Sequence, residues 1–465
     1  MSNGLLIESV GVAAAADIPD TILDAEQLCA RLDVLDGAGP VALGVSGGSD
    51  SLALMHVMQL WMQSRSTAFD ASSSPVTVLT VDHQLRDASA EEARQVGRWA
   101  GTLGFKHATL VWHGPKPKSG LAAHARDARY RLMTQWCVTQ GAGRLLIAHT
   151  LDDQAETVLM RLGRGSGVDG LSAMAPMTML NGVAIVRPFL DVSRAQLRQY
   201  LEGLGQSWID DPSNEDTAYE RVRVRAALES LGSLGLTPQR LALTARRLQR
   251  ARSALDAMAN RAMEDHVEAH RSGYCRIDKR LMREHPEEVA LRVLGRCLTA
   301  VGGTYYAPRQ SALEDLCAGL QAGDLKTRTL GGCQILDDDG HIMIVREPGR
   351  VAREPLALSP GERLVWDSRF KVGYDLDNAV LKPRTGLCVQ PLQAQGWAQM
   401  KQYGYRCPRP VREGLVSFWC GKELVAVPHF DFRSDLLDQN VRITADFCNF
   451  PLLEGARTIT DSSPL

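Results

Sequence analysis

Short apolar strands alternate with helices in the first half of the chain, and this alternation constrains the fold more than any other feature. Strands are predicted at Val41–Val45, Val76–Val81, His107–Trp112 and Leu145–Ala148. Helices with apolar residues at helical spacing are predicted at Leu52–Met62, Ser89–Leu103, Leu121–Thr139 and Leu151–Leu162. Strands that alternate with helices of this length form βαβ units. The sequence therefore predicts an α/β domain whose parallel sheet has helices on both faces.

After the α/β region, the predicted secondary structure and the composition of the chain change twice, which indicates further domains. From about Tyr219 the sequence is helical and basic, residues 327–347 are predicted as two strands, and residues 348–360 contain three prolines, as linkers do. A chain of 465 residues is long enough for roughly two to four domains. We expect an α/β domain over 1–225, a mainly helical domain over 226–347 and a small α+β domain over 361–465.

Charge and cysteine content narrow the class of protein. With 52 basic and 54 acidic residues the formal charge is −2, which excludes a uniformly basic nucleic-acid binder but allows a local basic stripe. The ten cysteines form no C-x-x-C pair, which is typical of free thiols in a reducing cytosol. The N-terminus lacks the basic start of a secretory signal, and no apolar stretch approaches the ~20 residues of a membrane helix. We expect a cytoplasmic protein without a membrane segment.

A glycine-rich turn, SGGSDS, stands between the first predicted strand and the helix that follows it. Glycines let the backbone approach a ligand closely, and loop amides in front of a helix N-terminus form a site for an anion. Because the carboxylate of Asp50 would repel phosphate, we expect a Mg²⁺ ion between them. The loop lacks the lysine of a Walker motif. The plainer alternative is a strand-to-helix turn that serine and aspartate cap.

This turn resembles the loop of the pyrophosphate-loop family of ATP-dependent enzymes, which carries S-G-G-x-D-S after its first strand. The resemblance implies that ATP is cleaved between its α- and β-phosphates, that a substrate oxygen is adenylated, and that the loop holds the departing pyrophosphate. It leaves the acceptor open, because GMP synthetase, asparagine synthetase, tRNA thiolases and lysidine synthase share the loop. The predicted ATP-binding residues are Ser46, Gly47, Gly48, Ser49, Asp50 and Ser51.

Further sequence motifs indicate which substrate accepts the adenylate. They lie at the ends of predicted strands or on the helix leading into the next strand, where open α/β sheets bind ligands. They are VDHQLR (81–86), ARDARY (125–130), HTLDDQAET (149–157), GRGSG (163–167) and RPFL (187–190). Together with WIDDPSNEDTAYERVRVR (208–225), they resemble the tRNA(Ile)-lysidine synthases.

The resemblance implies a two-step reaction on an isoleucine tRNA with a CAU anticodon. ATP, accompanied by Mg²⁺, adenylates the oxygen on carbon 2 of the wobble cytidine, and the ε-amine of free lysine then displaces AMP to leave lysidine. The middle domain would contact the tRNA and the C-terminal domain its acceptor stem. The implied active-site residues are Asp50, Arg129, His149 and Asp153. Arg129 suits the α-phosphate, where charge develops.

The start of the helix predicted after the fourth strand carries most of the candidate acid–base groups. His149, Asp153 and Glu156 recur near one face of this helix. The carboxylates there, with that of Asp152, can hold Mg²⁺, orient a lysine ammonium or take the proton that the amine must lose. The plainer alternative is that Thr150 and Asp153 form a capping box.

A basic stripe follows, with eight arginines over residues 221–252 and a single acidic residue, Glu229. Arginine side chains bind RNA through its phosphates, and these contacts do not depend on the base sequence. The residues Arg221, Arg223 and Arg225 also match the Arg-rich exit segment of the resembled enzymes, so we expect them to bind tRNA. For residues 246–252 alone, a solvated helix face is the better interpretation.

Two other functions stay open. A tRNA thiolase commonly needs paired cysteines near the loop, whereas the predicted α/β domain has only Cys29 and Cys137. A non-catalytic tRNA-binding protein with a relict nucleotide site is disfavoured by the intact motifs Ser46–Ser51 and His149–Glu156. The oligomeric state is left open, with a homodimer as one option.

Overall fold

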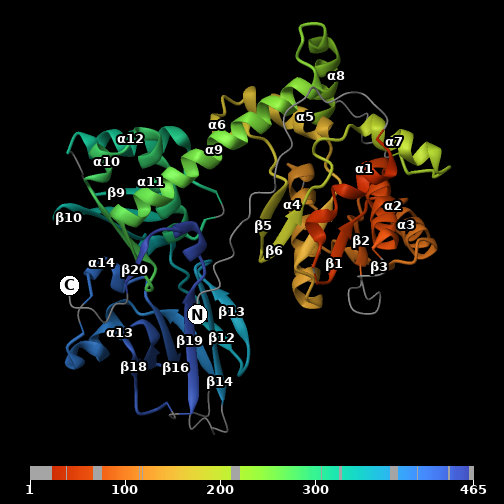
Figure 1. Ribbon diagram of the computed structural model, residues 1–465. Helices are drawn as coiled ribbons and strands as arrows, with labels where there is room; N and C mark the ends of the chain where they lie inside the picture. The colour runs from red at the N-terminus through yellow and green to blue at the C-terminus, as the bar shows by residue number, and fades with distance from the viewer. Residues whose placement is uncertain are drawn as a thin grey trace. The chain divides into compact units, whose positions relative to one another are not determined.

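The computed structural model describes residues 23–37, 39–65, 76–114, 116–117, 119–210, 220–304, 306–323, 327–376, 386–405, 407–437 and 440–459. Residues 211–219 of the stretch WIDDPSNEDTAYERVRVR lie outside these ranges. The chain forms two compact units, which divide between Arg252 and Ser253 (Figure 1). The domain boundary expected at residue 225 falls inside helix α8 (Glu220–Gly232) of the first unit.

A six-stranded sheet forms the centre of the first unit. Its strands are β1 (Val41–Gly44), β2 (Val76–Asp82), β3 (Lys106–Val111), β4 (Arg144–Ile147), β5 (Met177–Leu180) and β6 (Val183–Val186). They lie in the order β3-β2-β1-β4-β6-β5, and every neighbouring pair is parallel except β5 and β6. The predicted fold class is therefore confirmed. The hairpin β5–β6 was not predicted, although Asn181 and Gly182 at its turn both have positive φ and Asn-Gly is a strong hairpin signal.

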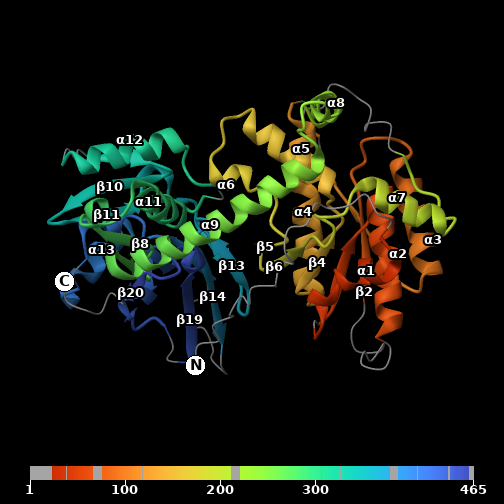
Figure 2. The same cartoon turned by 45° about the horizontal axis from the view of Figure 1, so that its top comes forward.

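Helices cover both faces of this sheet (Figure 2). They are α1 (Ala25–Ala30), α2 (Ser49–Ser64), α3 (Ser89–Thr102) and α7 (Arg194–Gly203), with α4 (Leu121–Gln140) on the other face. The helices α5 (Leu151–Leu162), α6 (Val168–Leu171), α8 and the start of α9 (Pro238–His266) pack against one another in a separate cluster. One buried cluster joins the sheet to α1, α2, α3 and α7, and a second, with Met133 and Cys137, joins it to α4. These two apolar layers fix the sheet between the helices.

The strand order reverses next to β1. The chain runs from β1 to β2 and β3 on one side and then returns to place β4 on the other. At such a switch point the loops after neighbouring parallel strands diverge, and the crevice at their carboxyl ends is the usual ligand site of an open α/β sheet. The two loops that flank this crevice are the glycine-rich turn after β1 and the segment His149–Thr150 after β4.

The second unit contains a second six-stranded sheet, in the order β20-β7-β8-β11-β10-β9. Its strands are β7 (Val267–His270), β8 (Tyr274–Asp278), β9 (Arg328–Leu330), β10 (Cys333–Asp338), β11 (His341–Arg346) and β20 (Arg457–Ile459), and the helices α10 (Leu281–Glu284), α11 (Glu287–Gly302) and α12 (Gln310–Gln321) accompany it. The strand pair β10–β11 confirms the two strands predicted over 327–347. The mainly helical interpretation missed β7 and β8, because strands this short carry too few residues for their period to show.

Smaller sheets follow, one of five strands and one of three. Their elements are β12 (Leu356–Leu358), β13 (Arg363–Trp366), β14 (Phe370–Leu376), β15 (Leu387–Pro391), α13 (Gln393–Met400), α14 (Arg409–Arg412), β16 (Val416–Cys420), β17 (Glu423–Val427), β18 (Phe432–Arg433) and β19 (Val441–Phe447). One strand, β12, lies within the expected linker, and a single buried core joins Ile277 and Leu294 to Phe370 and Val389. The three-domain division stays a prediction.

No helix in the described ranges combines the length and the apolar composition that crossing a bilayer requires.

Candidate active site

The glycine-rich turn after β1 depends on Gly47, whose φ is 93°. A Cβ atom at this position would lie 2.7 Å from Ile209 Cδ1. The Gly47 carbonyl accepts a hydrogen bond of 2.9 Å from Ile209 N, in the segment that follows α7. The left-handed backbone and the close approach both require glycine, and this contact fixes the shape of the turn.

Ser51 closes the turn from inside. Its hydroxyl donates to the Gly48 carbonyl at 2.9 Å and accepts from Ser46 N at 3.2 Å. Gly48 is the N-cap of α2 and has no side chain to cap it, so the N–H groups of the first turn of α2 are left for a ligand. Together with the positive end of the helix dipole, they form a site for an anion such as pyrophosphate.

Arg194, the first residue of α7, links the turn to the loop after β4. Its Nε donates to Asp50 Oδ2 at 3.0 Å, and its Nη2 lies 3.7 Å from Asp153 Oδ1. Its backbone N donates to Asp152 Oδ2 at 2.7 Å. Two predicted carboxylates from distant segments, Asp50 and Asp153, therefore meet at one guanidinium, and a third, Asp152, holds the backbone of the same residue. Sequence reasoning missed Arg194, although the Ser193–Gln196 capping box places it at the start of the helix.

The two carboxyl groups beside Arg194 have pKa values that are shifted in opposite directions. Burial raises the pKa of the Asp50 carboxyl, and Arg194 only partly opposes this effect. Burial also acts to raise the pKa of Asp153, but His149, Arg194, a hydrogen bond from the Thr150 backbone and Arg221 together outweigh it, so the pKa of Asp153 is lowered. The two carboxylates raise the pKa of Arg194 in spite of its burial. Asp153 and Arg194 are thus a charged pair at neutral pH.

Asp153 also caps the start of α5, so the predicted capping box is confirmed, and the catalytic role of Asp153 stays a prediction. Thr150 N and Thr150 Oγ1 donate to Asp153 Oδ2 at 2.9 Å and 3.1 Å, and Asp153 N donates back to Thr150 Oγ1 at 3.4 Å. The other oxygen, Oδ1, faces Arg194 and lies 4.0 Å from Arg221 Nη1. The two roles use different atoms of one carboxylate and do not compete.

Glu156 lies one turn further along α5 and is 1% exposed. Its Oε1 accepts a hydrogen bond of 3.0 Å from Arg225 Nε. Within the described part of the chain its Oε2 has no hydrogen-bond donor, and Arg221 Nε lies 4.0 Å away. Burial and the neighbouring Asp153 raise the pKa of Glu156. A buried carboxylate with a raised pKa and an oxygen without a donor is suited to accept a proton from an amine.

His149 is buried beneath the same crevice and accepts a hydrogen bond of 3.2 Å at Nδ1 from Arg187 Nε. Burial, with the charges of Arg126 and Arg187, lowers the pKa of His149 to about 3, against the opposing effect of Asp153. The imidazole is therefore neutral at neutral pH. In this state His149 can position Arg187 as a hydrogen-bond acceptor, but it has no proton to spare as an imidazolium acid.

Arg129 borders the site one strand away from the turn. Its Nε donates to His83 Nε2 at 3.4 Å, at the carboxyl end of β2. Burial and the charge of Arg129 lower the pKa of His83 to about 4. Nearby, Asp82 Oδ1 accepts from Gln84 N at 2.8 Å and thereby shapes the loop after β2. The α-phosphate role of Arg129 stays a prediction.

Two of the three arginines expected to bind tRNA lie beside the carboxylates of α5, and a role of these arginines in tRNA binding stays a prediction. Arg221 and Arg225 lie four residues apart, on one side of α8, and contact Asp153 and Glu156. Arg223, between them, is exposed. The structure therefore brings Arg221 and Arg225 into the candidate active site and leaves Arg223 at the surface of α8.

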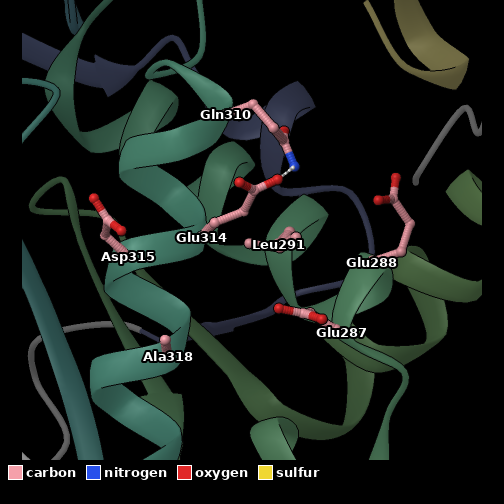
Figure 3. A pocket seen from close by; sticks show the side chains of 7 residues that line it. All are labelled: Glu287, Glu288, Leu291, Gln310, Glu314, Asp315 and Ala318. Atoms are coloured by element: carbon pink, nitrogen blue, oxygen red, sulfur yellow. Dashed lines mark hydrogen bonds between the residues drawn. The ribbon is translucent and has the colours of Figure 1, made fainter.

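A hollow in the second unit is a less suitable nucleotide site. It lies between α11 and α12, where Gln310 Nε2 donates to Glu314 Oε1 at 3.1 Å (Figure 3). Its charged lining residues are all acidic, and they are Glu287, Glu288, Glu314 and Asp315. Four carboxylates repel a polyphosphate or an RNA backbone. The crevice of the first unit is the better candidate.

Comparison with known proteins agrees with this assignment. Residues 23–231 match the family model of the PP-loop domain. The chain is 39% identical over 396 residues to the tRNA(Ile)-lysidine synthase of Ruegeria pomeroyi, which covers 83% of this chain and 88% of the relative. It is 44% identical over 340 residues to the tRNA(Ile)-lysidine synthase of Methylobacterium nodulans, which covers 71% of this chain and 98% of the relative. The chain belongs to the tRNA(Ile)-lysidine synthase family.

Membership in the tRNA(Ile)-lysidine synthase family confirms the predicted class of enzyme, an ATP-dependent ligase that modifies tRNA. It also confirms ATP as a substrate of the first unit. Among solved structures, the U34-tRNA thiolase NcsA from Methanococcus maripaludis matches with a TM-score of 0.42 and 16% identity, covering 49% of this chain and 78% of that chain.

Proposed function

We propose that this enzyme ligates free lysine to carbon 2 of the wobble cytidine of the isoleucine tRNA with a CAU anticodon, and releases AMP and pyrophosphate. The observation that carries the proposal is the meeting of Asp50, Asp153 and Arg194 beside an anion site formed by the turn after β1. This arrangement combines a cradle for a leaving pyrophosphate, carboxylates for a metal, and a buried base, Glu156, on the same helix as Asp153.

In the first step, the cytidine O2 attacks the α-phosphorus of ATP and pyrophosphate leaves. The amides of the turn and the N-terminus of α2 would stabilise the charge that develops on the leaving group. Arg198, whose Nε donates to Ser49 Oγ at 3.4 Å, brings a further cation to the edge of the turn. The cytidine is left as an adenylate whose carbon 2 is open to attack.

Mg²⁺ fits the carboxylates of this crevice. In the described ranges, no three His, Cys, Asp or Glu side chains cluster closely enough to hold a metal ion by themselves. Mg²⁺ usually binds one or two carboxylates and completes its shell with waters and substrate phosphates. Asp50 and Asp153, which share Arg194 as a partner, would hold it in this way. Once bound, the ion would neutralise charge on the phosphates.

In the second step, the lysine amine loses a proton, attacks carbon 2 and displaces AMP. We assign the proton to Glu156, because its pKa is raised and its Oε2 has no hydrogen-bond donor in the described part of the chain. Arg225 would keep the Glu156 side chain in place through Oε1.

The test is a reaction with purified protein, ATP, lysine and the tRNA transcript, followed by mass analysis of the wobble nucleoside. We expect lysidine at the wobble position, with AMP and pyrophosphate in equal amounts. ADP as the product, or an unmodified cytidine, would refute the proposal. Omitting lysine should leave the adenylated tRNA, which separates the two steps.

The thiolase alternative finds no support in the cysteines of the first unit. Cys29 and Cys137 are both buried, in separate apolar clusters. Burial raises the pKa of both thiols, that of Cys137 to about 11, whereas sulfur transfer needs a reactive thiolate. A cytoplasmic location and a homodimer stay predictions.

A further inference from the structure

The first half of α9 carries an arginine stripe, defined here as Arg246, Arg247 and Arg250. At 100° per residue these side chains fall within an arc of roughly 100° on one side of the helix. Arg247 and Arg250 are exposed, and Arg246 is half-buried. The three lie in the part of α9 that belongs to the first unit.

The opposite side of α9 is anchored, so the arginine stripe is held in a fixed direction. Leu241 and Ala245 are buried against α5 and α8. Gln249 Nε2 donates to the carbonyls of Ser172 and Met174 at 2.8 Å and 2.9 Å. Figure 2 shows this half of α9 running beside α5 and α6. A rigid helix face loses less side-chain and backbone freedom when it binds a ligand.

Within the described ranges, no acidic side chain of the first unit pairs with the arginine stripe. Between Pro238 and Leu255 the sequence has no acidic residue. Among the described residues, none of the three arginines has an ion-pair partner, whereas Arg252 lies 3.4 Å from Asp169 and Arg225 is 2.9 Å from Glu156. The whole protein has a net charge of −2, so this positive charge is concentrated locally on the arginine stripe. A concentrated positive surface attracts a polyanion.

We propose that the arginine stripe binds the phosphate backbone of the tRNA. This inference rests on the proposed function, which supplies an RNA as substrate. The guanidinium fork matches phosphate oxygens in a bidentate way, and all three residues are arginine rather than lysine. The phosphate-binding role expected of Arg221 and Arg225 thus passes to residues whose charges are not already paired with Asp153 and Glu156. The solvated-face interpretation of 246–252 is the alternative that the experiment must exclude.

The experiment compares Arg247→Gln/Arg250→Gln with a matched control, Arg94→Gln/Arg98→Gln. The control removes the same charge from exposed arginines of α3, which pair with Glu91. The Kd of the tRNA transcript is measured from roughly 50 to 200 mM salt. Each lost phosphate contact reduces the magnitude of the slope of log K against log salt by roughly 0.7–0.9. The α9 variant loses two arginines, so the magnitude of its slope should be smaller by about 1.4–1.8. The control should keep the slope of the unmodified protein.

Equal slopes for the α9 variant and the α3 control would overturn the proposal. A tRNA with another anticodon should show the same loss as the isoleucine tRNA, because phosphate contacts carry no sequence information. A loss confined to the isoleucine tRNA would also overturn it. Arg247→Glu reverses the charge of one exposed arginine and should weaken tRNA binding more than Arg247→Gln does. An Arg247→Glu variant that binds tRNA as tightly as the unmodified protein would contradict the proposal.

The failure of this inference can be told apart from the failure of the proposed function. Lysidine formation by the unmodified protein tests the function, and the salt slope tests the surface. If lysidine forms and the slopes are equal, only the arginine stripe is wrong. With saturating tRNA, the α9 variant should regain its kcat for lysidine formation while its KM for tRNA stays raised.

Discussion

Arg194 Nε donates a hydrogen bond of 3.0 Å to Asp50 Oδ2, although 144 positions separate the two residues in the sequence. Asp50 belongs to the turn after β1, and Arg194 also faces Asp153 in the first turn of α5, which follows the neighbouring strand β4. One guanidinium therefore holds together the two carboxylates that we assign to Mg²⁺. In this arrangement Arg194 balances their charge before the substrates bind, and we expect its partners to change when Mg²⁺ and ATP arrive.

The first prediction concerns this pair. Asp50→Asn should lower the release of pyrophosphate by roughly 10²-fold or more, because it removes the charge that would hold the metal. Arg194→Gln should also slow the reaction. We expect a double-mutant cycle over the two positions, measured by urea unfolding, to show an interaction free energy of about 0.5–3 kcal/mol. This is the range for residues in direct contact. Additive free energies of unfolding would show that the two side chains do not interact in solution.

The second prediction separates the two roles of Asp153. Asp153→Asn keeps an oxygen for Thr150 N but loses the charge on the atom that faces Arg194, so lysidine formation should fall roughly 10²-fold with little change in Tm. Asp153→Ala should lose the activity and also about 1 kcal/mol of stability. Asp24→Ala breaks the capping box of α1, outside the site, and should cost stability alone. A folded and active Asp153→Asn enzyme would remove this residue from the reaction.

The third prediction concerns the proton acceptor. Glu156→Gln preserves the shape of the side chain and removes its ability to accept a proton. The first step should proceed and the second should slow, so adenylated tRNA should accumulate at saturating lysine. Mass analysis of the wobble nucleoside over time measures both species. Equal slowing of pyrophosphate release and lysidine formation would assign Glu156 to the first step instead.

Glu156 also predicts a dependence of stability on pH. Its pKa in the folded protein is raised above the ordinary value for glutamate, so between these two pKa values the native state binds more protons than the unfolded chain. The contribution of this group to stability therefore falls as the pH rises through the raised pKa. Relative to the unmodified protein, the Tm of Glu156→Gln should increase from about pH 4 to pH 8. A constant Tm difference across this range would contradict the raised pKa.

The fifth prediction concerns His149, whose shift has the opposite sign. Its pKa is lowered to about 3, so below the ordinary histidine pKa of about 6.5 the unfolded chain takes up a proton that the native state refuses. As the pH falls from about 6.5 toward 3, the unmodified protein should lose more stability than His149→Gln. His113→Gln, at an exposed histidine, is the matched control. Parallel loss of Tm in all three proteins would contradict a buried neutral imidazole.

Much of the first unit follows from local sequence patterns. The four predicted strands match β1 to β4 within a residue or two at each end, and the glycine-rich turn lies where the pattern changes from strand to helix. Local signals of this kind survive folding, because the period of apolar residues, the glycine at a positive φ and the capping residues act over a few neighbouring positions. The resemblance to the lysidine synthases was likewise readable, since its motifs are continuous in the chain.

The tertiary structure decided which of these helices, strands and turns come into contact. No local pattern shows that Arg194 reaches Asp50, or that Arg221 and Arg225 turn toward Asp153 and Glu156. Nor does one show that the arginine stripe of α9 has no acidic partner among the residues that the structure describes. These contacts depend on the strand order around β1 and on the packing of α5, α8 and α9, which join residues far apart in the sequence. The sequence determined the chemistry of the groups, and the fold determined which charges are paired and which are free to bind a substrate, because electrostatic interaction depends on distance in space and on burial.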